Sequence, residues 1–78
     1  MTNLEIYNNA FKEAFEIKEE ELAGLEYQAI PAWDSVGHMN LIAALEDSFD
    51  IMMDTDDIID FSSYEKGKEI LAKYDKVI

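Results

Sequence analysis

The sequence predicts an all-α protein built from four helices. Apolar residues recur at intervals of three and four in four separate segments, which is the spacing of one face of an α-helix. No stretch of four or more residues alternates convincingly between apolar and polar, as a half-buried strand would. The 78 residues contain no repeat, low-complexity tract or Pro/Gly-rich linker. We therefore expect one helical domain over residues 1–78.

The first helix is expected over residues 3–16, followed by a long loop. Its apolar stripe consists of Leu4, Tyr7, Ala10, Phe11, Ala14 and Phe15. Thr2 or Asn3 would serve as its N-cap. The helical pattern breaks over residues 17–34, which contain Gly24 and Pro31. A loop of this length in a small domain is usually functional or carries a short helical turn of its own.

The remaining helices are expected over residues 35–49, 55–61 and 63–75. The helix at 35–49 follows "PAWDS", where Asp34 and Ser35 are both suited to helix capping. The third is short and begins in "DTDDIIDF", with Thr55 as its expected N-cap. The fourth begins at "SSYE", where Ser62 and Glu65 have the spacing of a capping box.

The composition restricts the partners. Eighteen acidic residues against six lysines give a formal charge of −12, so nucleic acid and anionic membranes are not expected partners, whereas basic protein surfaces are. The chain has no cysteine, so any thiol chemistry would need an imported thiol. The longest apolar run, residues 41–45, is too short to span a bilayer, and the N-terminus lacks a signal-peptide pattern. We expect a cytoplasmic protein without membrane insertion.

The helix at 35–49 has two apolar faces. With Val36 set to zero on a helical wheel, the core face lies at about 140–240 degrees; it consists of Leu41, Ile42, Leu45 and Phe49. Val36, Met39 and Ala43 form a second patch at about 300–360 degrees, interleaved with polar residues. Scattered exposed apolar residues are normal on protein surfaces, so the spacing alone leaves open whether this patch is a docking surface.

The segment "DSVGHMNLIAALEDSF" resembles the acyl and peptidyl carrier proteins. In these proteins an Asp-Ser pair opens the second of four helices, which ends in Leu-Glu-acidic-x-Phe. The long first loop and the short third helix fit the same family, so the resemblance covers nearly the whole chain. It implies that Ser35, with Asp34 as its motif partner, carries 4'-phosphopantetheine, and that an acyl or aminoacyl group rides on this arm as a thioester. It also implies a protein that is not itself an enzyme.

The resemblance further implies where partners dock. Val36, Met39 and Ala43 match the apolar contact positions of the family, and Glu46 and Asp47 match its acidic ones. The implied partners are a phosphopantetheinyl transferase, an acyl or aminoacyl activating enzyme and acyl-processing enzymes with basic docking surfaces, with the carrier itself a monomer.

The sequence departs from the carriers of fatty acid synthesis at three places. Gly37 and Asn40 stand where carriers of fatty acid synthesis are commonly acidic, and Trp33 before Asp-Ser is more typical of discrete carriers of specialised pathways.

One alternative to the carrier hypothesis remains, with a hydrolase as a marginal case. The chain could be an acidic helical interaction module that uses the Val36, Met39 and Ala43 face without a prosthetic group, with Ser35 as a helix cap. A hydrolase is not expected, because Ser35 and His38 lack a nucleophile elbow. We expect a structural role for His38, or contact with the arm, and a loop anchor in Trp33.

The acidic cluster after the second helix is expected to be a solvated surface with capping roles; it consists of Asp50, Asp54, Asp56, Asp57 and Asp60. It lacks the pattern of a calcium-binding loop, and no metal site is expected.

Overall fold

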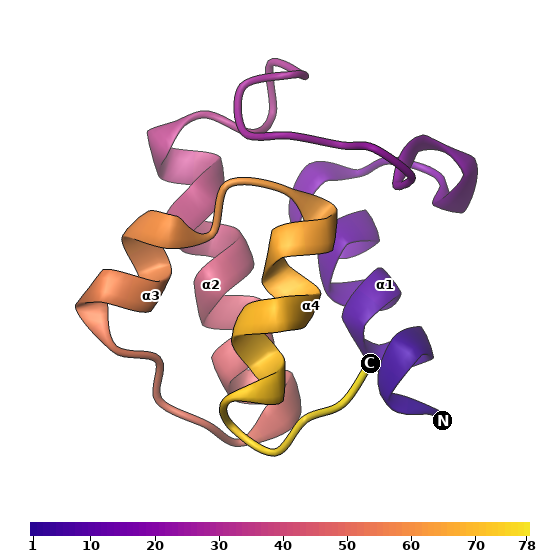
Figure 1. Ribbon diagram of the computed structural model, residues 1–78. Helices are drawn as coiled ribbons and strands as arrows, with labels where there is room; N and C mark the ends of the chain where they lie inside the picture. The colour runs from indigo at the N-terminus through magenta and orange to yellow at the C-terminus, as the bar shows by residue number, and fades with distance from the viewer.

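The computed structural model describes residues Met1–Ile78 and contains four α-helices, one short 3₁₀ helix and no strand, which confirms the all-α prediction. The elements are α1 (Asn3–Phe15), η1 (Glu19–Glu21), α2 (Ser35–Phe49), α3 (Thr55–Asp60) and α4 (Tyr64–Ala72). Figure 1 shows α2 and α4 in the middle, with α1 on one side and α3 on the other. The loop between α1 and α2 crosses the end of the bundle at which α2 begins. No helix has both the length and the apolar character needed to cross a membrane.

The helix boundaries agree closely with those predicted. α1, α2 and α3 begin at the predicted residues, whereas α4 begins one residue later than predicted and ends three residues earlier. α1 and α2 both stop at a residue in the left-handed conformation, Glu16 and Asp50. The long loop carries the 3₁₀ turn η1, as its length suggested.

Two of the predicted N-caps are wrong. α1 has the expected cap: the Thr2 hydroxyl accepts a hydrogen bond from the Glu5 N–H, and the Glu5 carboxylate accepts one from the Thr2 N–H. α3 is preceded by Asp54, and Thr55 is already helical. α4 is capped by Ser63, whose hydroxyl accepts from the Lys66 N–H, and not by Ser62. The carbonyl of Ser62 instead accepts a hydrogen bond from the Tyr27 N–H of the long loop, so the helix begins one residue later.

The core is dominated by aromatic rings. Sixteen apolar residues form one buried cluster, and six of them are aromatic residues in mutual ring contact: Tyr7, Phe11, Phe15, Trp33, Phe61 and Tyr64. Trp33 has 0% of its surface exposed and stacks on Phe15 at 5.2 Å between ring centroids, which confirms its expected role as a loop anchor. Leu4, the first residue of the predicted apolar stripe, is partly exposed.

The interior leaves little space around α4. A Cβ atom added at Gly67 would lie 2.2 Å from both the Phe61 ring and the Tyr7 hydroxyl. That hydroxyl donates a hydrogen bond of 2.6 Å to the Tyr64 carbonyl, and the Tyr64 hydroxyl donates to the Asn8 side chain. Burial raises the pKa of Tyr7 and of Tyr64 above the usual value. The space left by the missing side chain at Gly67 is therefore filled by the side chains of Phe61 and Tyr7.

Asp57 is not part of a solvated surface, which corrects the expectation for the acidic cluster. Only 6% of its surface is exposed, and its carboxylate accepts hydrogen bonds from the Lys73 ammonium and the Tyr74 hydroxyl. The Tyr74 hydroxyl also accepts from the Asp54 N–H at 2.9 Å. The hydrogen bond from Lys73, followed by that from Tyr74, holds the pKa of Asp57 below its usual value. This cluster fastens α3 to the end of α4.

We expect Asp57→Asn to lower the free energy of unfolding at pH 7, because the amide keeps the shape of the carboxylate without its charge. The pKa of Asp57 is lowered on folding, so the stabilisation is complete above the pKa of an unfolded aspartate, about 3.9. It is lost as the pH falls through the lower pKa of the folded state. Urea unfolding from pH 7 downward should show the difference between wild type and variant shrinking in acid.

The control for this prediction is Asp56→Asn, at an exposed position of the same helix, which should change stability little at any pH. A difference between wild type and Asp57→Asn that stays constant down to acid pH would show that the charge of Asp57 is not the source of its contribution.

Candidate functional site

Ser35 is the first residue of α2 and is exposed to solvent. Asp34 provides the N-cap, since its Oδ1 atom accepts a hydrogen bond of 2.8 Å from the Gly37 N–H. The Ser35 hydroxyl is therefore not used to cap the helix. The two residues of the Asp-Ser pair therefore have different roles: Asp34 caps the helix, and Ser35 presents a free hydroxyl next to the cap.

Gly37 allows the long loop to end directly against α2. A Cβ atom at position 37 would lie 1.8 Å from the Ala32 carbonyl oxygen, a distance that no side chain tolerates. The backbone before Asp34 therefore lies against the first turn of the helix, which fixes where Ser35 points. The sequence pattern marks Gly37 only as a missing acidic residue. Its role in the packing depends on a loop conformation that the sequence pattern does not reveal.

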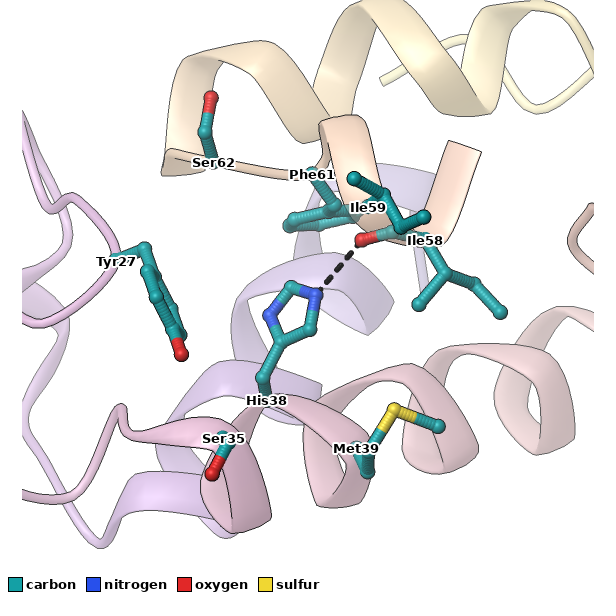
Figure 2. A pocket seen from close by; sticks show the side chains of 8 residues that line it. All are labelled: Tyr27, Ser35, His38, Met39, Ile58, Ile59, Phe61 and Ser62. Carbon is teal, nitrogen blue, oxygen red and sulfur yellow. Dashed lines mark hydrogen bonds between the residues drawn. The ribbon is translucent and has the colours of Figure 1, made fainter. Parts of the chain in front are cut away.

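A pocket of about 360 Å³ opens beside Ser35. It lies between the long loop, the first turns of α2, α3 and the connection from α3 to α4. Its lining consists of Tyr27, Ser35, His38, Met39, Ile58, Ile59, Phe61 and Ser62. Figure 2 shows the hydroxyl-bearing residues Tyr27, Ser35 and Ser62 on one side and the apolar Met39, Ile58 and Ile59 on the other. The free serine hydroxyl thus lies at the edge of an apolar cavity.

The loop wall of this pocket is held by backbone hydrogen bonds. The Tyr27 N–H donates to the Ser62 carbonyl at 2.9 Å, and the Tyr64 N–H donates to the Leu25 carbonyl at 2.8 Å. These bonds join the loop to the connection between α3 and α4. They belong to an isolated bridge between Glu26 and Ser63, which is the only strand-like pairing in the chain.

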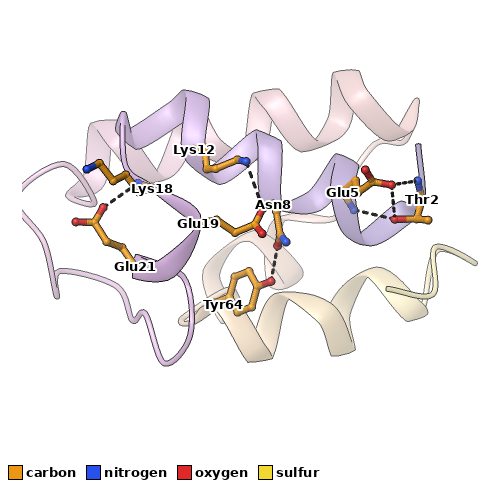
Figure 3. A network of polar contacts seen from close by, with 8 residues as sticks. All are labelled: Thr2, Glu5, Asn8, Lys12, Lys18, Glu19, Glu21 and Tyr64. Atoms are coloured by element: carbon orange, nitrogen blue, oxygen red, sulfur yellow. Dashed lines mark hydrogen bonds and ion pairs between the residues drawn. The ribbon is translucent and has the colours of Figure 1, made fainter.

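The start of the loop is fixed to α1. Figure 3 shows the ion pair between Lys12 and Glu19, with 3.3 Å between Nζ and Oε1. At the beginning of η1 the Glu21 carboxylate accepts a hydrogen bond from the Lys18 N–H. The loop is therefore paired with α1 at its start and with the connection after α3 in its middle, so a segment without regular structure can form one wall of a defined pocket.

His38 joins two elements at the floor of the pocket. Its Nδ1 atom lies 3.0 Å from Trp33 Nε1, and its Nε2 atom lies 2.8 Å from the Ile58 carbonyl oxygen (Figure 2 shows the second contact). Both ring nitrogens therefore have partners other than Ser35. The geometry gives His38 the structural role that was one of the two expectations for it.

The second apolar face of α2 is exposed, as the helical wheel indicated. Val36 and Met39 have 69% and 53% of their surface exposed, and Ala43 is exposed as well. The four residues assigned to the core face, Leu41, Ile42, Leu45 and Phe49, are all buried. Ile59 of α3, at 72% exposed, shares the pocket lining with Met39 and extends the apolar surface onto a second helix.

The two acidic residues near the end of α2 differ in their surroundings. Asp47 is exposed, whereas Glu46 is half-buried and its carboxylate accepts a hydrogen bond of 2.9 Å from the Met53 N–H. Glu46 therefore orders the connection to α3, a role that its position in the sequence did not predict. One carboxylate oxygen of Glu46 is therefore already engaged in a hydrogen bond within the chain.

Comparisons with protein-family models, curated proteins and solved structures found no match for this chain. The site combines a free serine hydroxyl at a helix N-terminus, an apolar pocket beside it, and an exposed apolar face on the same helix.

We expect Gly37→Ala to destabilise the protein by about 1–3 kcal/mol, because the new methyl group collides with the Ala32 backbone. In a helix without such a contact, replacing Gly by Ala would instead stabilise by about 0.5–1 kcal/mol. Destabilisation by Gly37→Ala would therefore show that the loop backbone lies close to position 37, whereas stabilisation would show that it does not. Urea unfolding provides the measurement, with Asn40→Ala, at an exposed position of the same helix, as the control. Equal or greater stability of Gly37→Ala would contradict this close packing of Ala32 against Gly37.

Proposed function

We propose that the chain is a carrier protein of the acyl or peptidyl carrier type. It holds an acyl or aminoacyl group as a thioester on a 4'-phosphopantetheine arm attached to Ser35 and presents it to partner enzymes. The observation that carries the proposal is the position of Ser35. Its hydroxyl is exposed at the first residue of α2, is free of the capping role, and lies beside an apolar pocket.

The start of α2 suits a phosphodiester. The first N–H groups of a helix have no acceptor within it, and the helix dipole favours a negative charge at this end. Asp34 satisfies the Gly37 N–H, while the N–H groups of Ser35 and Val36 precede the first intrahelical bond. Attached at Ser35, the prosthetic group would supply the thiol that this cysteine-free chain lacks.

The pocket supports the same proposal. An acyl group attached near Ser35 would find apolar side chains of α2 and α3 beside it. The bundle interior, by contrast, is filled by the protein's own aromatic rings, and Gly67 adds no free space there. The order of four helices, with a long first loop and a short third helix, also matches the arrangement that the resemblance to carrier proteins implies.

The surface supports docking on basic partners. The exposed apolar face of Val36, Met39 and Ala43 begins directly beside Ser35. Asp47 flanks it, and the whole chain has a formal charge of −12. Charge complementarity speeds encounter with a positively charged surface, while the apolar side chains provide contact area. A transferase that primes Ser35 and an enzyme that loads the arm would both approach this face.

One alternative shares this face without needing Ser35. The exposure of Val36, Met39 and Ile59 on two adjacent helices would also suit an acidic interaction module with no prosthetic group. The two functions differ in whether Ser35 is modified.

We expect the protein to gain one phosphopantetheinyl group when incubated with coenzyme A and a broad-specificity phosphopantetheinyl transferase, as measured by intact mass. Ser35→Ala should gain nothing, because it lacks the accepting hydroxyl. Ser62→Ala is the matched control, since Ser62 is the other serine of the pocket, and it should be modified like the wild type.

A folded wild type that gains no mass while a known carrier is primed in the same reaction would refute the carrier proposal and leave the interaction module. Modification of Ser35→Ala would place the attachment site elsewhere.

We expect Met39→Glu to reduce kcat/KM of the transferase by about tenfold or more, because it places a charge in the apolar contact face. Stability should change by less than about 0.5 kcal/mol, since the side chain is largely exposed. Ser48→Glu adds the same charge at an exposed position outside this face and should leave the kinetics nearly unchanged. Equal rates for all three proteins would exclude Met39 from the docking surface, and unfolding of Met39→Glu would overturn its assignment as a surface residue.

A further inference from the structure

We propose that His38 is a pH-sensitive joint between the long loop and α3, and that protonation of its imidazole ring loosens the loop wall of the pocket beside Ser35. The inference rests on the geometry of the unmodified chain. It goes beyond the proposed function, because it holds whether or not Ser35 carries a prosthetic group.

The two contacts of His38 require one state of the ring. The indole N–H of Trp33 can only donate a hydrogen bond, so Nδ1 of His38, at 3.0 Å, must accept it and carries no proton. The single proton of the neutral ring is then on Nε2, which donates to the Ile58 carbonyl at 2.8 Å. Only the neutral Nε2-protonated ring can make both bonds.

The two bonds satisfy the indole N–H of Trp33 and the backbone carbonyl of Ile58. Trp33 is completely buried, and His38 supplies the acceptor for its indole N–H. Ile58 lies in the last turn of the six-residue helix α3, where carbonyl groups lack intrahelical donors. His38 supplies that donor. The ring therefore connects the end of the loop, α2 and α3 through two hydrogen bonds.

Protonation breaks one of these bonds and keeps the other. A proton on Nδ1 would face the indole N–H of Trp33, so two donors would meet without an acceptor, which is costly at a buried site. The bond from Nε2 to the Ile58 carbonyl would become charge-assisted and persist. Trp33 is held by its stacking on Phe15, and the bond to Ile58 is kept. The strain is therefore relieved when the His38 ring moves away from Trp33 and from the rest of the loop.

The pocket is affected because the same loop forms its wall. The Tyr27 ring packs edge-on near the His38 ring, with 5.4 Å between the ring centroids, and lines the cavity next to it (Figure 2). When the link between His38 and Trp33 is lost, the loop remains attached near the pocket through the bonds of Leu25 and Tyr27 to the connection between α3 and α4. Movement of the His38 ring also removes its edge contact with the Tyr27 ring, so we expect the hydrogen bond from the Tyr27 N–H to the Ser62 carbonyl to open more often in acid.

No charged group in contact with His38 competes with this effect. From the loop, the ring faces the phenol of Tyr27 and the indole of Trp33, and the nearby carboxylate of Asp34 is bound to the Gly37 N–H. From the connection after α3 it faces the apolar Phe61. The acidic groups of α3 are Asp56, Asp57 and Asp60; Asp57 is held by Lys73 and Tyr74, and the other two are exposed. α1 and α4 contribute no ionisable partner to the ring, which makes no ion pair.

The chain provides its own reporters, because it contains one histidine and one tryptophan. The experiment follows the indole N–H signal of Trp33 and the ring signals of His38 by NMR from pH 8 to pH 5, on unprimed protein at constant ionic strength. Histidine is the side chain that ordinarily changes charge in this range. We expect the indole signal to shift in one transition whose midpoint equals that of the His38 ring. An indole signal that stays fixed while the ring titrates would overturn the proposal.

The comparison variant is His38→Gln, whose amide can accept from Trp33 and donate to Ile58 but does not titrate. Its indole signal should not shift over the same range. A transition like that of the wild type would assign the effect to another group and overturn the proposal. The wild-type titration remains decisive by itself if this variant folds poorly.

Amide hydrogen exchange of Tyr27 tests the loop wall. The ratio of wild-type to His38→Gln protection factors at Tyr27 should fall between pH 7.5 and pH 5.5, since the intrinsic exchange rates cancel. A constant ratio at Tyr27 with a falling ratio within α3 would show that α3, and not the loop, is released. Because all measurements use unprimed protein, a failure of priming at Ser35 leaves their outcome unaffected.

Discussion

The burial of Trp33 is the constraint on which the position of the site depends. Its indole ring stacks on Phe15, meets the edge of Phe11 and donates a hydrogen bond to His38, so one side chain contacts residues of both α1 and α2. It stands at the end of the long loop and immediately before the Asp-Ser pair. The largest side chain in the chain thus fixes the residue that precedes the N-cap, and Gly37 lets the backbone at Ala32 approach closely enough for this to happen. Ser35 is held in place by core packing although its own side chain is exposed.

The acidic composition and the aromatic core have separate roles. Most carboxylates lie on the surface, where they repel one another but remain hydrated, and the buried rings provide the opposing stabilisation. Asp57 is the exception, because Lys73 and Tyr74 compensate its burial. This arrangement allows a strongly negative surface to coexist with a small and densely packed interior. The short helix α3 is the element that benefits most, since six residues have too few internal hydrogen bonds to be stable alone.

Local patterns predicted the fold well and its tertiary details poorly. Helical periodicity gave the helical class, the starts of α1, α2 and α3 and the exposed face with Val36 and Met39. The cap of α4 was placed one residue early because Ser62 and Ser63 are both suitable locally, and a bond from distant Tyr27 decides between them. Burial of Asp57 depends on partners sixteen and seventeen residues away. For the site, the pattern predicted the position of Ser35 at the helix start but left open whether Asp34 or Ser35 caps the helix. The pocket and the two partners of His38 exist only once the loop has packed.

The tie between the loop and the connection after α3 uses backbone groups alone, namely those of Leu25, Tyr27, Ser62 and Tyr64. Such bonds do not depend on which side chains the residues carry. Tyr27 and Ser62 can therefore be exchanged for larger, smaller or more polar residues while the tie is kept, and each exchange would alter the shape of the cavity that both line. In evolutionary terms, the contour of the pocket can diverge between related chains without a cost to the bundle that supports it.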